Sequence, residues 1–260
     1  MATRKKAIAH KSGTNLPANI DKQMEEEARN INSTITNVGS DQIKLDQDNG
    51  LFFEIPGLGQ AEPPMEVVVV DYISSNQFYI DPYDKNNIVP PDCWAIGKDI
   101  RALAPDPNRV TDPEAETCAE CPNNEFGSKG AGKACQNRFL VAVVPPDADE
   151  DEELRYLSIS PMGLKSFSTF VSAVAARFKK PPVGAIVEVG IVKAGKGFTT
   201  SFGKFKPNPN YREHYMRRDD AKPVLEAGFE AAASGNTDKP APKRKAARKK
   251  APARKRQARR

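Results

Sequence analysis

Residues 160–178 read Ser-Pro-Met-Gly-Leu-Lys-Ser-Phe-Ser-Thr-Phe-Val-Ser-Ala-Val-Ala-Ala-Arg-Phe, the strongest helical pattern in this chain of 260 residues. Ser160 and Pro161 suit the cap and the first position of a helix. Apolar side chains then recur at spacings of three and four, which places them on one face: Leu164, Phe167, Phe170, Val171, Val174 and Phe178. Pro181 and Pro182 end the pattern. We therefore expect one helix that packs its apolar face against a sheet.

Strand patterns surround this helix. They are short segments rich in β-branched and aromatic residues and bounded by turn formers: residues 51–55, 67–73, 77–80, 138–144, 154–160, 184–193 and 198–205. Residues 194–197, Ala-Gly-Lys-Gly, suit a tight hairpin between the last two. Several strands with one inserted helix predict a mainly β protein, an OB-like Greek-key barrel of the kind that often binds nucleic acid. A β-sandwich would produce the same local pattern and stays open.

The two ends of the chain differ from this strand-rich part. Residues 1–18 form a basic, polar arm without the apolar run of a secretory signal, and residues 19–48 suit a short charged helix over 19–31 and a linker. We expect the barrel over residues 49–206, with an excursion at about 93–137, and a helical segment over 207–236 that breaks near Pro223 and Gly228. Residues 237–260 predict a disordered tail. No apolar run approaches the length of a membrane span, so we expect no membrane association and a cytoplasmic location.

Charge is divided unequally along the chain. Residues 239–260 contain 12 Lys or Arg and no acid, so the other 238 residues hold 27 basic residues against 34 acids, a net charge of −7, although the whole chain carries +5. This asymmetry predicts a polyanionic partner or an intramolecular contact between tail and body. Residues 147–153, Asp-Ala-Asp-Glu-Asp-Glu-Glu, hold six acids. They are either a solvated hairpin loop or a docking site for the tail.

Three of the four cysteines lie in one stretch. Cys118 and Cys121 form a Cys-x-x-Cys pair, a Gly-rich loop follows, and Cys135 ends it, while Cys93 lies upstream in Pro-Pro-Asp-Cys-Trp. This spacing predicts a structural zinc site with Cys93, Cys118, Cys121 and Cys135 as ligands. Because 24 residues separate Cys93 from Cys118, its part as the fourth ligand stays open.

Other interpretations of the cysteines have less support. A chain without a secretory signal is expected in a reducing compartment, where structural disulfides are rare. A redox Cys-x-x-Cys should lie between a strand and a helix, whereas Pro122, Asn123 and Asn124 favour a turn. Isolated buried thiols remain the alternative to zinc.

Motifs for catalysis are incomplete. Gly127 to Lys133 has the spacing of a phosphate-binding loop, but Ala134 stands where Ser or Thr should hold magnesium. The zinc-deaminase motifs His-x-Glu and Pro-Cys-x-x-Cys are both missing. His10 lies in the basic arm, and His214 is expected on a polar surface. We therefore expect no enzymatic activity. A metal-dependent RNA-processing enzyme built on scattered carboxylates is the remaining enzymatic alternative.

Basic and aromatic residues on the expected strands predict a nucleic-acid surface. Period-two alternation would put Phe198, Thr200, Phe202 and Lys204 on one face, where rings stack on bases and Lys neutralises phosphate. The full set of candidates in the body is Lys129, Lys133, Arg138, Phe139, Tyr156, Phe198, Phe202 and Lys204. Because the body is acidic, we expect these side chains to converge on one concave surface, away from residues 147–153.

The tail predicts binding to phosphates without reading of sequence. Its candidate contacts are Lys243, Arg244, Lys245, Arg248, Lys249, Lys250, Arg254, Lys255 and Arg256. A nuclear-localisation run is the competing interpretation.

The cysteine block, the Arg138-led strand, the Ser160-Pro161 helix and two closing strands together resemble a class of bacteriophage single-stranded-DNA-binding proteins, over about residues 50–205. The resemblance implies an OB-type barrel that coats single strands during DNA replication or recombination, with zinc fixing an excursion. It also implies replication or recombination proteins as partners and a location in the host cytoplasm or nucleoid. Such proteins commonly end in an acidic tail, whereas this chain ends basic, which favours additional duplex binding or DNA compaction. The alternative is a histone-like architectural or transcription-associated protein that acts through its tail.

Overall fold

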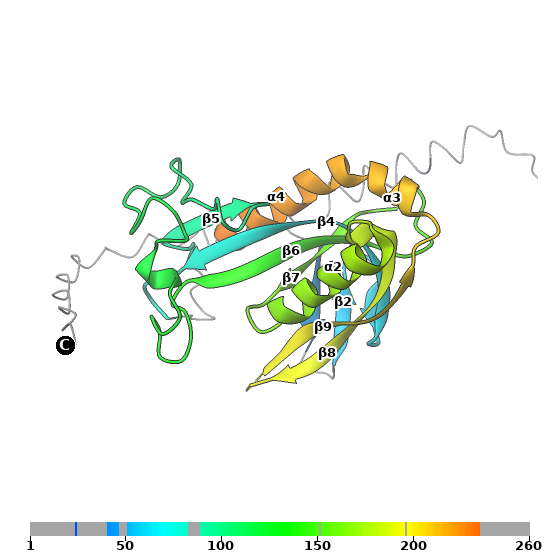
Figure 1. Ribbon diagram of the computed structural model, residues 1–260, viewed down its shortest axis with the longest axis horizontal. Coiled ribbons are helices and arrows are strands. Elements are labelled where there is room, and N and C mark those ends of the chain that lie inside the picture. Colours follow the sequence, from blue (N-terminus) through cyan, green and yellow to red (C-terminus); the bar gives the residue numbers. More distant parts are fainter. Residues whose placement is uncertain are drawn as a thin grey trace, which may run out of the picture. The chain divides into compact units, whose positions relative to one another are not determined.

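The computed structural model describes residues 24, 41–46, 51–82, 89–150, 152–195 and 197–234 (Figure 1). The chain divides into two units, Met1–Ser40 and Asp41–Arg260, and every described residue except Met24 belongs to the second. The predicted arm over residues 1–18, the predicted helix over 19–31 apart from Met24, and the predicted tail over 237–260 lie outside the described residues. The architecture below is that of the second unit.

This unit is mainly β, with one strongly curled sheet that forms a half-barrel and a few helices (Figure 1). In the described residues the strands are β1 Gln42–Asp46, β2 Phe52–Ile55, β3 Gly59–Ala61, β4 Met65–Phe78, β5 Cys93–Gly97, β6 Gln136–Val144, β7 Arg155–Ile159, β8 Ala185–Ala194 and β9 Gly197–Pro207. They pair in the order β3-β2-β1-β7-β6-β4-β8-β9, and β5 pairs with β4. β1 and β7 run parallel, whereas the other paired strands run antiparallel. The strands thus form one continuous sheet and not the two stacked sheets of a β-sandwich.

Strand β4 organises the sheet. One of its edges pairs with β6, while the other pairs with β8 near its start, at Met65 to Val68, and with β5 near its end, at Ser74 to Phe78. The register with β6 shifts between Val69 and Asp71, and that between β8 and β9 shifts between Val187 and Val189. Such bulges increase local twist and bend the strand, which explains the curl.

The concave face of the sheet is covered by α2, Leu164–Phe178. Its buried residues are Phe167, Phe170 and Val174, and Leu164, Val171 and Phe178 pack partly buried against the same core, so the predicted apolar face is confirmed. The predicted start is wrong by three residues. The helix begins at Leu164 after Gly163, while the Ser160 hydroxyl lies 2.7 Å from the Thr199 hydroxyl and does not cap the helix.

The convex face is covered by α4, Arg218–Ser234, which follows α3, Tyr211–Met216. Ala221, Leu225 and Phe229 are buried against this face. Asp71 of β4 anchors the start of the helix, because its carboxylate pairs with Arg218 at 3.2 Å and with Lys98. The predicted break near Pro223 and Gly228 is wrong, since both residues lie within α4 and the helices separate at Arg217.

Gly228 allows α4 to approach the sheet closely. A Cβ at this position would lie 2.6 Å from Cζ of Tyr156, a ring that is itself buried in the convex-face core. Two short 3-10 helices complete the described elements: η1 Pro122–Asn124 and η2 Pro182–Gly184.

We predict that Gly228→Ala lowers the free energy of unfolding. Overpacking against Tyr156 should cost about 1–3 kcal/mol, which exceeds the gain of about 1 kcal/mol that Ala brings to a helix interior. Denaturant unfolding measures the difference. In a Tyr156→Leu background the same substitution should cost less. A Gly228→Ala protein more stable than the wild type would contradict the close approach.

Candidate metal centre and nucleic-acid interface

The four cysteines meet in one small cavity of about 20 Å³. Cys93 is the first residue of β5, and Cys135 immediately precedes β6. Cys118 lies in the loop between β5 and η1, and Cys121 is the residue before η1. Sheet pairing explains how Cys93 joins the others: β5 places it opposite Phe78 of β4, and β6 places Gln136 opposite the neighbouring Gln77. Cys93 and Cys135 therefore lie at the same end of the sheet, and all four cysteines are free thiols.

The thiols influence one another. Burial, together with the negative charge that the other three would carry as thiolates, raises the pKa of Cys135 to about 12. Burial, together with the charges that Cys118 and Cys121 would carry as thiolates, raises the pKa of Cys93 to about 11. A cation at the centre would reverse this effect, because a metal ion stabilises the thiolate form.

An amide network holds this cavity to the sheet. Asn76 of β4 forms a hydrogen bond with the Cys118 thiol, and its Oδ1 accepts one from Asn137 of β6 at 2.6 Å. Asn137 also donates to Asn124 of η1 at 2.9 Å, and Asn124 donates to the Cys118 carbonyl at 2.7 Å. Three asparagines on three elements thus orient one side of the thiol cluster.

The residues suit zinc in their chemistry, but they do not have its coordination geometry. Zinc takes four thiolates, and a cavity of about 20 Å³ holds about one small sphere. In the described part of the chain, however, no three His, Cys, Asp or Glu side chains already stand in a metal-coordinating arrangement. The thiols share a cavity without forming a coordination sphere, so zinc bonds of about 2.3 Å would require them to move inward.

A second, open groove of about 210 Å³ lies where the curled sheet does not close. One side of this gap, which we call the seam, is formed by β1 and β7, and the other by β9. In the described residues no backbone pairing joins the two sides. The lining residues are Gln42, Ile43, Lys44, Leu45, Arg138, Ser158, Ser160, Phe198, Thr199 and Thr200.

The groove favours an anion or a planar ring with polar edges. Lys44 and Arg138 supply positive charge, Phe198 supplies a half-buried ring, and no acidic residue lines it. The Nε of Arg138 is buried without a protein partner, although its Nη2 donates to Gln136 at 2.8 Å. Burial lowers the pKa of Arg138, and an anionic ligand would offset that cost.

The structure separates the predicted nucleic-acid contacts. Arg138 and Phe198 meet in the groove, and Lys129, Lys133 and Lys204 are exposed, the first two on the loop between η1 and β6. The tail candidates from Lys243 to Arg256 lie outside the described residues.

Three predicted ring contacts are corrected, because Phe139, Tyr156 and Phe202 are only 6%, 2% and 8% exposed. Phe202 stacks on Phe170 of α2 with ring centroids 5.6 Å apart, and Phe139 packs against Phe167. Phe202 is buried because its face of β9 lies under α2. The register shift follows Phe202 on β9 and breaks the period-two alternation that grouped it with Lys204, so that Phe205 also packs on Phe170.

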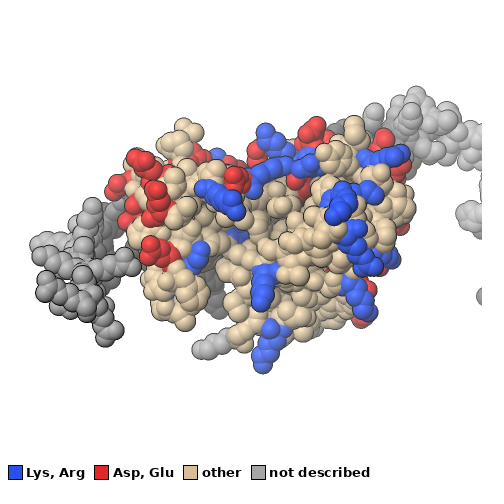
Figure 2. Space-filling model, in the orientation of Figure 1, with Lys and Arg blue, Asp and Glu red and all other residues tan. Residues whose placement is uncertain are grey.

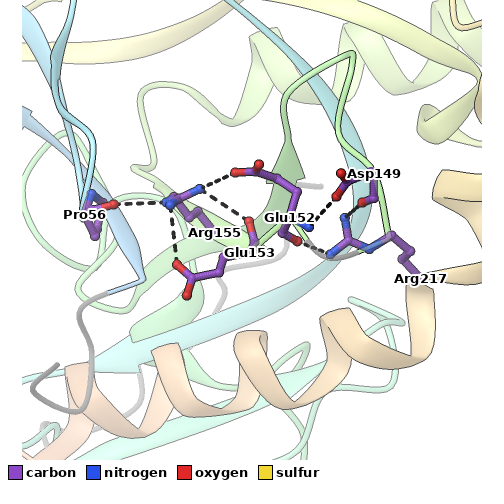
Figure 3. Close-up of polar contacts among 6 residues, drawn as sticks. All are labelled: Pro56, Asp149, Glu152, Glu153, Arg155 and Arg217. Atoms are coloured by element: carbon purple, nitrogen blue, oxygen red, sulfur yellow. Dashed lines mark hydrogen bonds and ion pairs between the residues drawn. The ribbon is translucent and has the colours of Figure 1, made fainter. Parts of the chain in front are cut away.

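The acidic loop between β6 and β7 is held in place by two nearly buried arginines (Figure 3). Arg217 donates to the carbonyls of Asp149, at 3.0 Å, and Glu152. Arg155 donates to the Pro56 carbonyl and pairs with the carboxylates of Glu152, at 3.2 Å, and Glu153, at 3.5 Å (Figure 3). Arg155 therefore anchors the described part of the loop to the turn between β2 and β3, and Arg217 anchors it to the junction of α3 and α4. These contacts distinguish it from a loop that is only solvated.

His214 supports the same loop. The prediction of a surface position is wrong, since His214 is 1% exposed. One ring nitrogen, Nε2, lies 3.2 Å from the Ala148 carbonyl and the other, Nδ1, lies 3.0 Å from the Asn208 amide. Nε2–H donates and Nδ1 accepts in the tautomer that satisfies both contacts, which gives this histidine a structural role.

Comparison with known protein families, with curated proteins and with solved structures found no match. No helix among the described residues has the length and apolar character needed to cross a membrane. The site therefore has to be interpreted from its own chemistry.

Sequence reasoning missed Lys44 and, apart from Thr200, the hydroxyl groups of the groove. Gln42–Asp46 alternates polar and apolar residues, so a period-two search over five residues would have found β1. The convergence of Ser158, Ser160, Thr199 and Thr200 has no local signal, because it depends on how β7 and β9 approach each other.

We predict that Arg217→Met frees the acidic loop. Loss of the two hydrogen bonds that the nearly buried Arg217 donates should lower the free energy of unfolding by about 1–3 kcal/mol, and cleavage after Glu150, Glu152 or Glu153 by a Glu-specific protease should accelerate. Arg212→Met is the matched control, because exposed Arg212 contacts Tyr211 and not the loop. Equal cleavage rates in the two variants would contradict an anchoring role for Arg217.

Proposed function

We propose that this protein binds single-stranded DNA without strong sequence preference, through an OB-type barrel stabilised by a structural zinc ion, and acts in phage-type replication or recombination. The observation that carries the proposal is the groove at the seam, where Lys44, Arg138 and Phe198 converge without an acidic residue. A groove with cations and a ring suits a strand whose bases stack while its phosphates are neutralised.

The order of elements supports an OB-type barrel. β4, β6, β7, β8 and β9, with α2 between the third and fourth, follow the five-strand pattern of that fold. OB-folds bind oligonucleotides over their second and third strands and the loops after the first and fourth. Arg138 lies on the second of these strands, Ser158 on the third, and Phe198 beside the loop after the fourth. The cysteine segment occupies the connection after the first.

Single strands suit this groove better than duplex DNA. A volume of about 210 Å³ is small beside a duplex, whose base faces are stacked and hidden from Phe198. Base stacking on an aromatic ring contributes about 1–3 kcal/mol per base. This contribution offsets the repulsion between DNA and residues 1–238, which carry a net charge of −7.

Zinc would be held by Cys93, Cys118, Cys121 and Cys135. Bound to four thiolates, it would stabilise the long connection between β4 and β6, which has few regular elements of its own. The Asn76 amide is placed to donate to the Cys118 sulfur, as the partners of zinc ligands often do.

A histone-like architectural function is the second candidate. The burial of Phe202 favours it, because one of the two rings predicted for base stacking belongs to the core. In that case the 12 Lys and Arg of residues 239–260 make the main DNA contact, and deletion of the tail should abolish binding to single strands and duplexes alike.

We predict that Phe198→Ala weakens binding to a labelled oligo-dT by about 5- to 150-fold, the equivalent of one lost stacking contact, and leaves duplex binding nearly unchanged. Phe198→Tyr should keep the affinity. Val192→Ala, at an exposed apolar position on β8, is the matched control. Fluorescence anisotropy measures each. Equal losses on single strands and duplex would favour the architectural function.

We predict one zinc per chain in protein purified under reducing conditions. Cys121→Ser should lose the metal and expose residues 93–135 to hydrogen exchange first, whereas Asn123→Ser, whose backbone carbonyl holds the turn, should keep it. Elemental analysis that finds no zinc in the wild-type protein would leave the cysteines as isolated thiols.

A further inference from the structure

Charge on the body is strongly segregated. Residues 160–207, which form α2, η2, β8 and β9, hold eight Lys or Arg and one acid, Glu188, a net charge of +7. Since residues 1–238 together carry −7, the remainder of that range carries −14. Figure 2 shows basic side chains spread over the half of the molecule that contains α2, β8 and β9, while acidic ones gather mainly at the opposite end, beside β5.

Six exposed cations define what we call the basic face: Lys165, Arg177 and Lys179 from α2 and its end, and Lys193, Lys204 and Lys206 from β8 and β9. Lys206 pairs with Glu66 at 2.7 Å. Elsewhere on this face, no acidic side chain in the described part of the chain pairs with Lys165, Lys179 or Lys204. Most of this positive charge is therefore left for an external anion.

The exposed side of α2 carries donors and no carboxylate. Ser168, Thr169 and Ser172 are exposed between Lys165 and Arg177, and the helix has no Asp or Glu. Protein surfaces ordinarily intersperse both signs of charge. Small hydroxyl groups let a polyanion approach closely, and hydroxyl and ammonium groups are common partners of phosphate oxygens.

The basic face continues from the groove. Ser160 and Phe198 to Thr200 line the groove, α2 begins four residues after Ser160, and β9 runs on from Thr200 to Lys204 and Lys206. Ser166 of α2 accepts a hydrogen bond from the Phe202 backbone at 2.8 Å, which keeps α2 and β9 side by side. A nucleic-acid strand that leaves the groove beside Ser160 and Thr200 meets the basic face next.

Protection of the sheet edge accounts for only part of the pattern. β9 ends the sheet, and lysines on an edge strand hinder pairing with other chains. That explanation covers Lys193, Lys204 and Lys206. It does not cover Lys165, Arg177 and Lys179, which lie on or beside a helix that has no strand edge to protect.

We propose that the basic face binds the phosphate backbone of the same nucleic-acid strand that occupies the groove. This inference rests on the proposed function. The groove takes a base against Phe198, and the next nucleotides cross α2 and β9 with their phosphates on Lys165, Lys179 and Lys204. The face recognises charge and not sequence.

The test uses the full-length chain and two lengths of oligo-dT, about 4 and about 16 nucleotides, which bracket the sites of single OB-folds. Lys165→Gln/Lys204→Gln removes two charges from the basic face, and Arg101→Gln/Lys222→Gln removes two exposed charges from other elements. For the long oligonucleotide, the first variant should lower the slope of log affinity against log salt by about 1.4, or about 0.7 per lost phosphate contact. The control variant should keep the wild-type slope. The short oligonucleotide should not distinguish the variants.

Three outcomes would overturn the basic face as a phosphate contact. In the first, Lys165→Gln/Lys204→Gln keeps the wild-type slope with the long oligonucleotide. In the second, this variant and the control variant lower the slope equally. In the third, binding to phosphatidylserine vesicles is measured as well, and Lys165→Gln/Lys204→Gln weakens that binding alone. Failure of the proposed function is separate, because the wild-type protein would then bind neither oligonucleotide in a manner that depends on Phe198.

Discussion

The pairing of β4 with three other strands is the constraint on which the described part of the protein depends. β4 is 14 residues long and nearly buried on both faces, because α2 packs on one side of the sheet and α4 on the other. Its far end fixes Cys93 and Cys135 through β5 and β6, while its near end carries β8 and so the hairpin with Phe198. One strand therefore sets the positions of both the thiol cavity and one side of the groove.

The thiol cavity and the groove are connected through β6. Asn137, which belongs to the asparagine network at the cavity, is followed by Arg138, which lines the groove. Adjacent residues of a strand point to opposite faces, so one short segment supports the thiols with one side chain and presents a cation with the next. A change in the thiol cluster that shifted β6 would move the guanidinium by a similar distance.

Sequence patterns predicted the regular elements well and the site only in part. Six of the seven predicted strand segments lie largely within observed strands, whereas β4 ends at Phe78 and contains only the first half of the predicted strand over 77–80. Residues 67–78 form a single strand, because buried Ser74, Ser75 and Asn76 continue the ladder with β5 and β6. The four cysteines line one cavity, and the spacing had left the part of Cys93 open because the pairing of β5 with β4 that brings it there has no local signal. Phe202 was misplaced because a strand pattern does not show which of its faces a helix will cover, and His214 because the Ala148 carbonyl that it contacts lies 66 residues away in the chain.

The unclosed seam has a topological consequence. Its two sides are joined by the side-chain hydrogen bond between Ser160 and Thr199, and in the described residues no strand ladder crosses it. A single neutral hydrogen bond contributes about 0.5–1.5 kcal/mol, far less than a row of backbone bonds. A polymer can therefore enter the groove sideways and leave the same way, without threading an end. Under the proposed function, a closed circle of DNA, which has no end to thread, meets the same entrance as a linear strand.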